Sequence, residues 1–95
     1  MAAYVIADVE VTDPALFEDY RGKVSATIEK YGGRYVARGG KVETLEGDWQ
    51  PHRVVILEFP SYERAREWYN SPEYKPLIAL RQRAANTIAA LTEGV

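Results

Sequence analysis

The sequence of 95 residues has no cysteine, a single histidine and no excess of positive charge. Without cysteine the chain can form neither disulfides nor thiolate metal sites, and it has no thiol nucleophile. Twelve lysines and arginines stand against 14 aspartates and glutamates, a net charge of -2, so we expect no nucleic-acid partner. The one histidine has no second ligand at a metal-binding spacing, and no glycine-rich phosphate-binding motif occurs. We therefore expect neither a metal nor a cofactor.

Long apolar runs are missing as well. No stretch approaches the ~18 residues that cross a bilayer, and the first residues carry no basic segment before Asp8. We expect a cytoplasmic protein that does not interact with a membrane. Hydrophobic residues still make up 46% of the chain and charged residues 27%, the balance of a globular protein. A chain of this length predicts one domain, residues 1–95.

Hydrophobic periodicity predicts elements in the order βαββαβ. Alternation predicts strands at residues 4–11, 53–59 and 87–92. A helix is expected from Asp13 and Pro14 to the pair Gly32-Gly33, and a second helical stretch from Ser61 that breaks near Pro72. Residues 34–46 are predicted to form one long strand bent at Gly39-Gly40, with a separate short hairpin as the alternative.

This order of elements predicts a ferredoxin-like α+β fold, an antiparallel sheet with its helices on one face. The residues expected to face the helices are Val5, Ala7, Val9, Val55, Leu57 and Phe59. The opposite face carries Tyr4, Ile6, Val54 and Ile56, and a bare apolar surface of this kind is unusual in a soluble monomer. We therefore predict a homodimer in which two sheets pack face to face.

Several segments together carry a resemblance to a known family. They are Tyr4–Ala7, Lys30–Tyr35, Arg38–Gly40, Glu46–Trp49, Val55–Ser61 and Trp68–Tyr74, followed by Leu77 and Arg81–Ala84. Over practically its whole length the chain resembles the family of domains of unknown function numbered 1330, in the dimeric α/β-barrel superfamily. The resemblance implies a ferredoxin-like subunit that pairs through its sheet.

The same superfamily includes cofactor-independent quinol monooxygenases, muconolactone isomerases and haem-binding proteins. By fold analogy, the resemblance suggests a cofactor-independent small-molecule enzyme of monooxygenase-like or isomerase-like type. The alternative is a non-catalytic dimeric module that binds a metabolite or a partner. The ligand would lie between sheet and helices or within the dimer barrel.

Three residues are candidates for catalysis. Asp8 and Glu58 each end an apolar set on the sheet face away from the helices, where two carboxylates close together would share a raised pKa and move protons on an enolisable substrate. The alternative is that Arg38 and Arg53 neutralise them within a dimer contact. His52, at the turn before a strand, is either a general base or haem ligand or else an ordinary surface residue.

Four residues are candidates for substrate binding. Tyr35, Arg38 and Asn70 are side chains that would polarise a carbonyl, and Asn70 and Tyr74 lie beside the helix break, where main-chain groups are free. The neighbouring Trp68 follows the helical period and is expected in the core. The charged residues of the second helical stretch, Arg81 among them, are interpreted as solvated helix faces.

Overall fold

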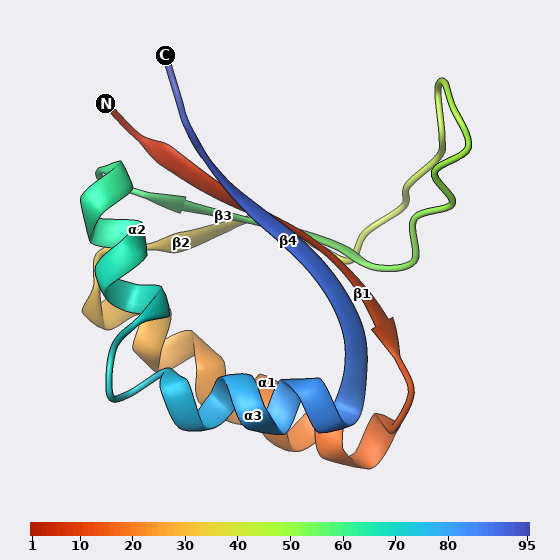
Figure 1. The fold of residues 1–95 in the computed structure, drawn as a ribbon, viewed down its shortest axis with the longest axis horizontal. Coiled ribbons are helices and arrows are strands. Elements are labelled where there is room, and N and C mark those ends of the chain that lie inside the picture. Colours follow the sequence, from red (N-terminus) through yellow and green to blue (C-terminus); the bar gives the residue numbers. More distant parts are fainter.

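The computed structural model describes residues 1–95 and has four strands and three helices. The strands form one antiparallel sheet in the order β2-β3-β1-β4, and the helices lie on one of its faces (Figure 1). The elements are β1 (Ala3–Val11), α1 (Pro14–Lys30), β2 (Arg34–Arg38), β3 (Val54–Phe59), α2 (Tyr62–Tyr69), α3 (Lys75–Ala84) and β4 (Ala85–Glu93). This is the predicted α+β ferredoxin-like fold. None of the three helices is both long and apolar enough to cross a bilayer.

The helices begin and end where the sequence predicted. The side chain of Asp13 accepts a hydrogen bond from Leu16 N at 3.2 Å before Pro14, and Ser61 Oγ accepts one from Arg64 N at 3.1 Å. Gly32 ends α1 with a φ of 80°, a conformation that favours glycine. Ser71 joins α2 to α3: its Oγ donates to Trp68 O at 2.7 Å and accepts from Tyr74 N at 3.1 Å.

The predicted strand over the second half of residues 34–46 is wrong. β2 ends at Arg38, and residues 39–53 form a loop without strand or helix that projects from the sheet (Figure 1). Neither the long strand nor the separate hairpin forms, because residues 42–46 are all exposed and find no neighbouring strand to complete a hydrogen-bonded ladder. Leu45 in this loop is 86% exposed.

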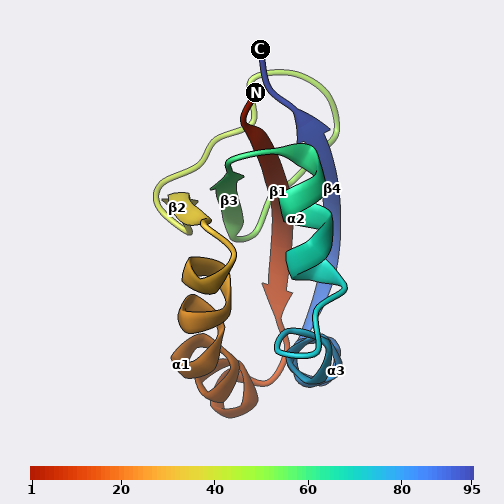
Figure 2. The ribbon, with the colours of Figure 1, turned by 90° about the vertical axis from the view of Figure 1, so that its left-hand side faces the viewer.

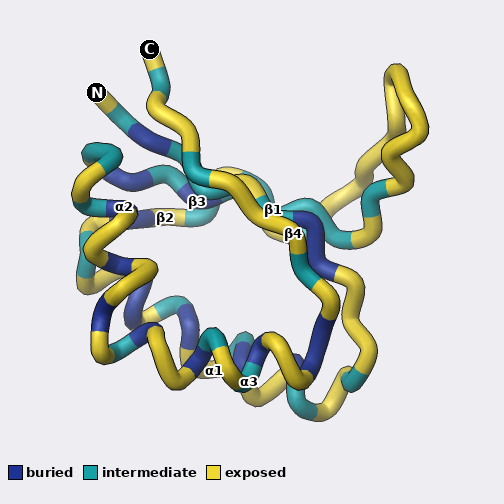
Figure 3. The backbone as a smooth tube through the Cα atoms, in the orientation of Figure 1, coloured by how far each residue is buried: buried dark blue, intermediate teal, exposed yellow.

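The pairing register sorts the strand residues into two faces. Ala7 of β1 lies between Val55 of β3 and Ala89 of β4. Two residues further along β1, Val9 lies opposite Thr87. These residues face the side of the sheet on which the helices lie (Figure 2). The outer face carries Tyr4, Ile6, Asp8, Val54, Ile56 and Glu58, as predicted, and also Ile88 of β4, which is 68% exposed. Figure 3 shows this exposure along β4.

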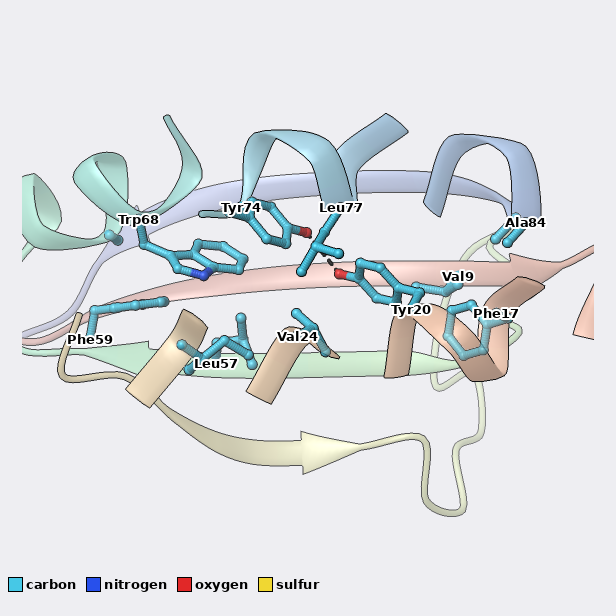
Figure 4. Packing of buried hydrophobic residues seen from close by; sticks show 13 residues of the cluster. Val9, Phe17, Tyr20, Val24, Leu57, Phe59, Trp68, Tyr74, Leu77 and Ala84 are labelled. Atoms are coloured by element: carbon cyan, nitrogen blue, oxygen red, sulfur yellow. Dashed lines mark hydrogen bonds between the residues drawn. The ribbon is translucent and has the colours of Figure 1, made fainter. Parts of the chain in front are cut away.

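Aromatic side chains fill most of the space between the sheet and the helices (Figure 4). Trp68 stacks on Tyr74 with ring centroids 4.0 Å apart and lies 5.2 Å from Phe59. Its indole Nε1 donates to Thr27 Oγ1 of α1 at 3.0 Å. Burying each such ring stabilises the fold by roughly 2–3 kcal/mol, so this stack fixes α2 and α1 against one end of the sheet.

Candidate functional site

A cavity lies between the inner face of the sheet and the helices. It forms where Ala7 and Ala89, two small residues, are paired side by side on the inner face. Ala7 is half-buried there and Ala89 is exposed. The free space open to the centre of a water molecule is about 70 Å³, and 14 of the 19 residues around it are hydrophobic. The cavity therefore has room for several waters or for a small apolar group.

The cavity has one polar end. On the inner face, Arg53 and Thr87 flank Val9 in one row across the sheet, and Arg38 lies in the next row opposite Val55. The helices add Arg21 from α1 and Arg81 from α3. The other end, near Trp68 and Phe59 in Figure 4, is apolar.

Contacts between the layers show that these arginines gather at the same end. The guanidinium carbon of Arg53 lies 5.7 Å from the ring centroid of Phe17, one turn before Arg21 on α1. α3 ends at Ala84, whose carbonyl oxygen accepts from Thr12 N and Asp13 N just after β1. Arg81 is thus one turn from the end of the sheet that carries Arg53.

Three of these arginines have no carboxylate partner. Arg81 is only 9% exposed, and its Nη1 donates to Tyr74 Oη at 2.7 Å. Arg38 stacks over the ring of Tyr35 at 4.3 Å, and Arg53 contacts no carboxylate. No aspartate, glutamate or histidine lines the cavity. The polar end is therefore positively charged.

Two tyrosine hydroxyls meet beside Arg81. Tyr20 Oη and Tyr74 Oη lie 2.8 Å apart, and both side chains are buried. Burial raises the pKa of each phenol, so both are protonated at neutral pH. Arg81 donates to Tyr74 Oη, and if Tyr74 in turn donates to Tyr20, the hydroxyl proton of Tyr20 is free for a ligand.

On the outer face, Asp8 anchors the projecting loop. Its carboxylate accepts from Trp49 Nε1 at 3.0 Å and from His52 N at 2.8 Å. Burial works against ionisation of Asp8, but the hydrogen bonds from Trp49 and His52 outweigh it and lower its pKa below the ordinary 3.8. The ring of His52 lies between Asp8 and Glu10, with a nitrogen 3.6 Å from each carboxylate.

Glu58 lies apart from Asp8 on the same outer face. It is opposite Tyr4, whereas Asp8 is opposite Val54, a separation of four residues or roughly 13 Å along the strand. Within one chain the two carboxylates therefore do not meet. Glu58 pairs with Arg34 and accepts from Tyr4 Oη at 3.4 Å. The expected neutralisation by Arg38 and Arg53 is wrong, because both arginines belong to the inner face.

Of the four candidate substrate-binding residues, three lie at the cavity and one does not. Tyr35, Arg38 and Tyr74 line the cavity. Asn70 does not: its Nδ2 donates to Arg66 O at 2.9 Å at the end of α2, and it borders a separate groove between α2 and β4.

Sequence reasoning missed the other polar groups of the cavity, which are Tyr20, Arg21, Thr87 and the buried Arg81. The interpretation of Arg81 as a solvated residue is wrong. A signal was present, because Arg81 lies on the same helical stripe as the buried Tyr74, Leu77 and Ala84. An arginine on such a stripe indicates either a buried ion pair or a binding site.

Comparison with known proteins identifies the family and the fold of the chain but not its function. The model of the family described as "Domain of unknown function (DUF1330)" matches residues 2–95. No curated protein sequence gives a significant match. A protein of unknown function from Rhodopseudomonas palustris, RPA0582, is similar in structure with a TM-score of 0.78 at 20% identity, covering 99% of this chain and 82% of that one.

Two further solved structures have the same fold at lower identity. SnoaB from Streptomyces nogalater, a cofactor-independent oxygenase, has a TM-score of 0.67 at 14% identity, covering 99% of this chain and 93% of its own. A dimeric ferredoxin-like protein of unknown function from Jannaschia sp. CCS1 has a TM-score of 0.72 at 8% identity, covering 99% and 100%. At these identities the likeness shows a shared fold.

Proposed function

The chain belongs to the DUF1330 family, a domain of unknown function, and from this premise we propose that it binds a compact aromatic molecule in the cavity between sheet and helices. We further propose that it acts on this molecule without a cofactor, as an oxygenase. The observation that carries the proposal is the cavity itself, with apolar and aromatic walls and a few polar groups at one end. Such a combination is typical of small-molecule sites.

The walls suit a planar ring. Tyr35, Trp68 and Tyr74 present aromatic surface to the cavity, and an inserted ring would pack against these side chains. The hydroxyl pair of Tyr20 and Tyr74 supplies a hydrogen-bond donor for an oxygen atom on that ring. If the ring oxygen becomes an anion during reaction, a donor already in place stabilises it.

A dihydroxybenzene illustrates the chemistry. In the oxygenase reaction, benzene-1,4-diol and dioxygen give 2-hydroxy-1,4-benzoquinone and water. The O–O bond breaks, and one oxygen atom forms a new bond to a ring carbon, whose C–H bond breaks. The two hydroxyl groups lose their protons as their oxygens become carbonyls. Of the three protons released, one stays on the new hydroxyl group and two leave in water with the other oxygen atom. The ring supplies all four electrons, so the reaction requires no other reductant. The fold likeness to SnoaB, a cofactor-independent oxygenase, supports this class of reaction.

One observation favours the alternative, a non-catalytic binding module. The cavity has no carboxylate or histidine to act as a general base, and the predicted catalytic residues Asp8, Glu58 and His52 all lie on or beside the outer face. These three remain candidates for catalysis in a site between two copies of the chain. In the cavity, a substrate would have to lose its proton without them.

We also propose that a second copy covers the outer face. Ile6 and Ile88 are exposed there, and Tyr4, Val54 and Ile56 are half-buried on the same face. A contiguous apolar surface of this kind marks an interface, and the Jannaschia protein of the same fold is dimeric. The projecting loop, anchored at Asp8 on this face, carries the exposed Leu45 and would extend over the partner.

Oxygen uptake tests the proposed activity. Purified protein is mixed with benzene-1,4-diol under EDTA and catalase, and both dissolved oxygen and the hydroxyquinone product are followed. We expect uptake with formation of hydroxyquinone. The variant Ala89→Leu, which fills the cavity, should lose it, and Ala79→Leu on the exposed surface of α3 should keep it. Binding of the diol without hydroxyquinone would establish the non-catalytic alternative, and equal rates in both variants would exclude the cavity as the site.

A further inference from the structure

We propose that the ligand of this cavity carries a carboxylate, bound at the polar end by Arg38, Arg53 and Arg81. Its ring would lie toward Trp68 at the apolar end. The inference rests on the proposed ligand-binding function of the cavity, but it does not depend on catalysis. It assigns the ligand to the class of compact aromatic carboxylates.

The first support is the distribution of unpartnered polar atoms. Four buried side-chain nitrogen or oxygen atoms have no hydrogen-bond partner: Arg21 Nε, Arg53 Nε, Arg81 Nε and Thr87 Oγ1. All four residues line this one cavity. Buried polar groups are normally hydrogen-bonded, so a concentration of unmet donors indicates that something binds there. Three of the four are guanidinium nitrogens, and guanidinium groups donate and never accept. Their missing partner is an acceptor, and a negatively charged one fits best.

The second support is the charge balance. Away from the cavity, cationic side chains either pair locally, as Arg34 does with Glu58 and Arg64 with Glu67, or are exposed to water, as Arg66 and Arg83 are. Arg38, Arg53 and Arg81 have no such partner, and no carboxylate lines the cavity. Arg38 is exposed, but Arg81 is buried and Arg53 is half-buried. A charge removed from water without a partner destabilises a fold, so the counter-charge missing from Arg81 and Arg53 is best supplied by a ligand.

The third support is that the backbone accommodates one of these arginines. Gly39 has a φ of 73°, and a Cβ at this position would lie 2.7 Å from Cζ and from Nη1 of Arg53. Only a glycine allows the guanidinium to lie this close to the chain. The neighbouring Gly40 has open space around it. The end of β2 therefore leaves room for the Arg53 guanidinium beside the cavity.

Size and polarity define the ligand further. With about 70 Å³ of free space and mainly hydrophobic walls, the cavity suits a single ring and excludes nucleotides or other large polar anions. A planar guanidinium matches a planar carboxylate through two parallel hydrogen bonds. Benzoate is therefore the minimal probe, and benzamide is its uncharged control of the same shape.

Isothermal titration calorimetry tests the inference. At low ionic strength we expect benzoate to bind at least tenfold more tightly than benzamide. Arg53→Gln, checked for folding by circular dichroism, should reduce benzoate affinity to that of benzamide and leave benzamide unchanged. Arg83→Gln, which removes an exposed charge from α3, should keep the preference. Gly39→Ala should weaken benzoate binding at least threefold by displacing Arg53, and Gly40→Ala should not.

The outcomes separate this inference from the proposed function. Equal affinity for benzoate and benzamide would overturn the carboxylate assignment and leave a neutral ligand for the cavity. Binding of neither probe would overturn the assignment together with the cavity as a ring-binding site. A benzoate preference that depends on Arg53, in a protein that consumes no dihydroxybenzene, would support the inference and remove the oxygenase activity.

Discussion

The two faces of the sheet use their charged residues in opposite ways. On the outer face the carboxylates are matched within the chain: Asp8 by Trp49 and His52, Glu10 by Asn86 and His52, and Glu58 by Arg34 and Tyr4. On the inner face, arginines project into an apolar cavity that contains no carboxylate. The outer polar groups are thus explained by the fold, whereas the inner ones are not.

This difference separates residues that look equally functional in the sequence. A charge whose partners lie in its own chain is accounted for by structure, and its removal should reduce stability. A buried charge without partners destabilises the fold, and its presence is best explained by a ligand that it binds. Removing a charged side chain should therefore lower the stability of the fold on the outer face and raise it on the inner face. Because the outer face is the proposed interface, mutations there should also weaken the dimer.

The largest expected effect concerns the outer face as an interface. Ile88→Lys places a charge within the proposed contact without disturbing the core, because Ile88 is exposed on the outer face. We expect the dimer to weaken by about 3 kcal/mol, roughly 100-fold in Kd. Sedimentation equilibrium measures this, with Ala79→Lys on the helix side as the matched control. A wild-type protein that is monomeric at tens of micromolar would contradict the assignment of this face.

The next effect is the loss of the loop anchor. Asp8→Ala leaves the indole of Trp49 and the amide of His52 without their acceptor, and we expect a loss of about 2–3 kcal/mol in the free energy of unfolding. Urea denaturation at fixed protein concentration gives this value. Asp8→Asn keeps one acceptor oxygen and should lose less. If Asp8→Ala were as stable as wild type, the carboxylate would not hold the loop.

A smaller change of opposite sign is expected on the inner face. Arg53→Met removes an unpartnered charge and keeps a long apolar side chain against Phe17. We expect unfolding to require about 1 kcal/mol more than in wild type, while benzoate binding is lost. Arg34→Met, which breaks an exposed ion pair on the other face, should not stabilise. Destabilisation by Arg53→Met comparable to that of Asp8→Ala would remove the distinction between the faces.

The smallest effect is a titration of the loop. The pKa of Asp8 is lowered in the folded protein, so its stabilising contacts are complete above the ordinary pKa of 3.8 and are lost as the pH falls through the folded value. The fluorescence of Trp49, taken as the difference between wild type and Trp49→Phe, should change with a midpoint below pH 3.8. Asp8→Asn should abolish this transition. A midpoint above pH 4 would show that burial dominates over the hydrogen bonds.

Global unfolding is a poorer readout of that titration. Hydrogen bonds from Lys30 and then from Tyr31 lower the pKa of Glu73 to about 2, so its contacts are lost over an overlapping acidic range. The local signal of Trp49 isolates Asp8.

The architecture could be predicted because it depends on local patterns. Alternation along residues 4–11 and the cap at Asp13-Pro14 fix β1 and α1 with little help from the rest of the chain. The loop could not be predicted in this way. Val42 and Leu45 fit a strand by pattern, but a strand needs a neighbour, and the sheet ends at β2.

The cavity could not be predicted from the sequence, for a related reason. It exists because Ala7 lies beside Ala89, a pairing that only the register of β1 with β4 determines. Residue type alone points to Tyr35 and Arg38, and both lie in its wall. The sequence suggests Arg53 only as a partner for the outer carboxylates, because alternation assigns residues to faces but does not show which face has free space.

The most direct test of the central claim is a crystal structure of the protein grown with benzoate. We predict density for one ring in the cavity, with its carboxylate oxygens about 2.7–2.9 Å from guanidinium nitrogens at the polar end, Arg53 included. A cavity that contains only water while benzoate lies elsewhere, or a ring whose carboxylate points away from the arginines, would contradict it.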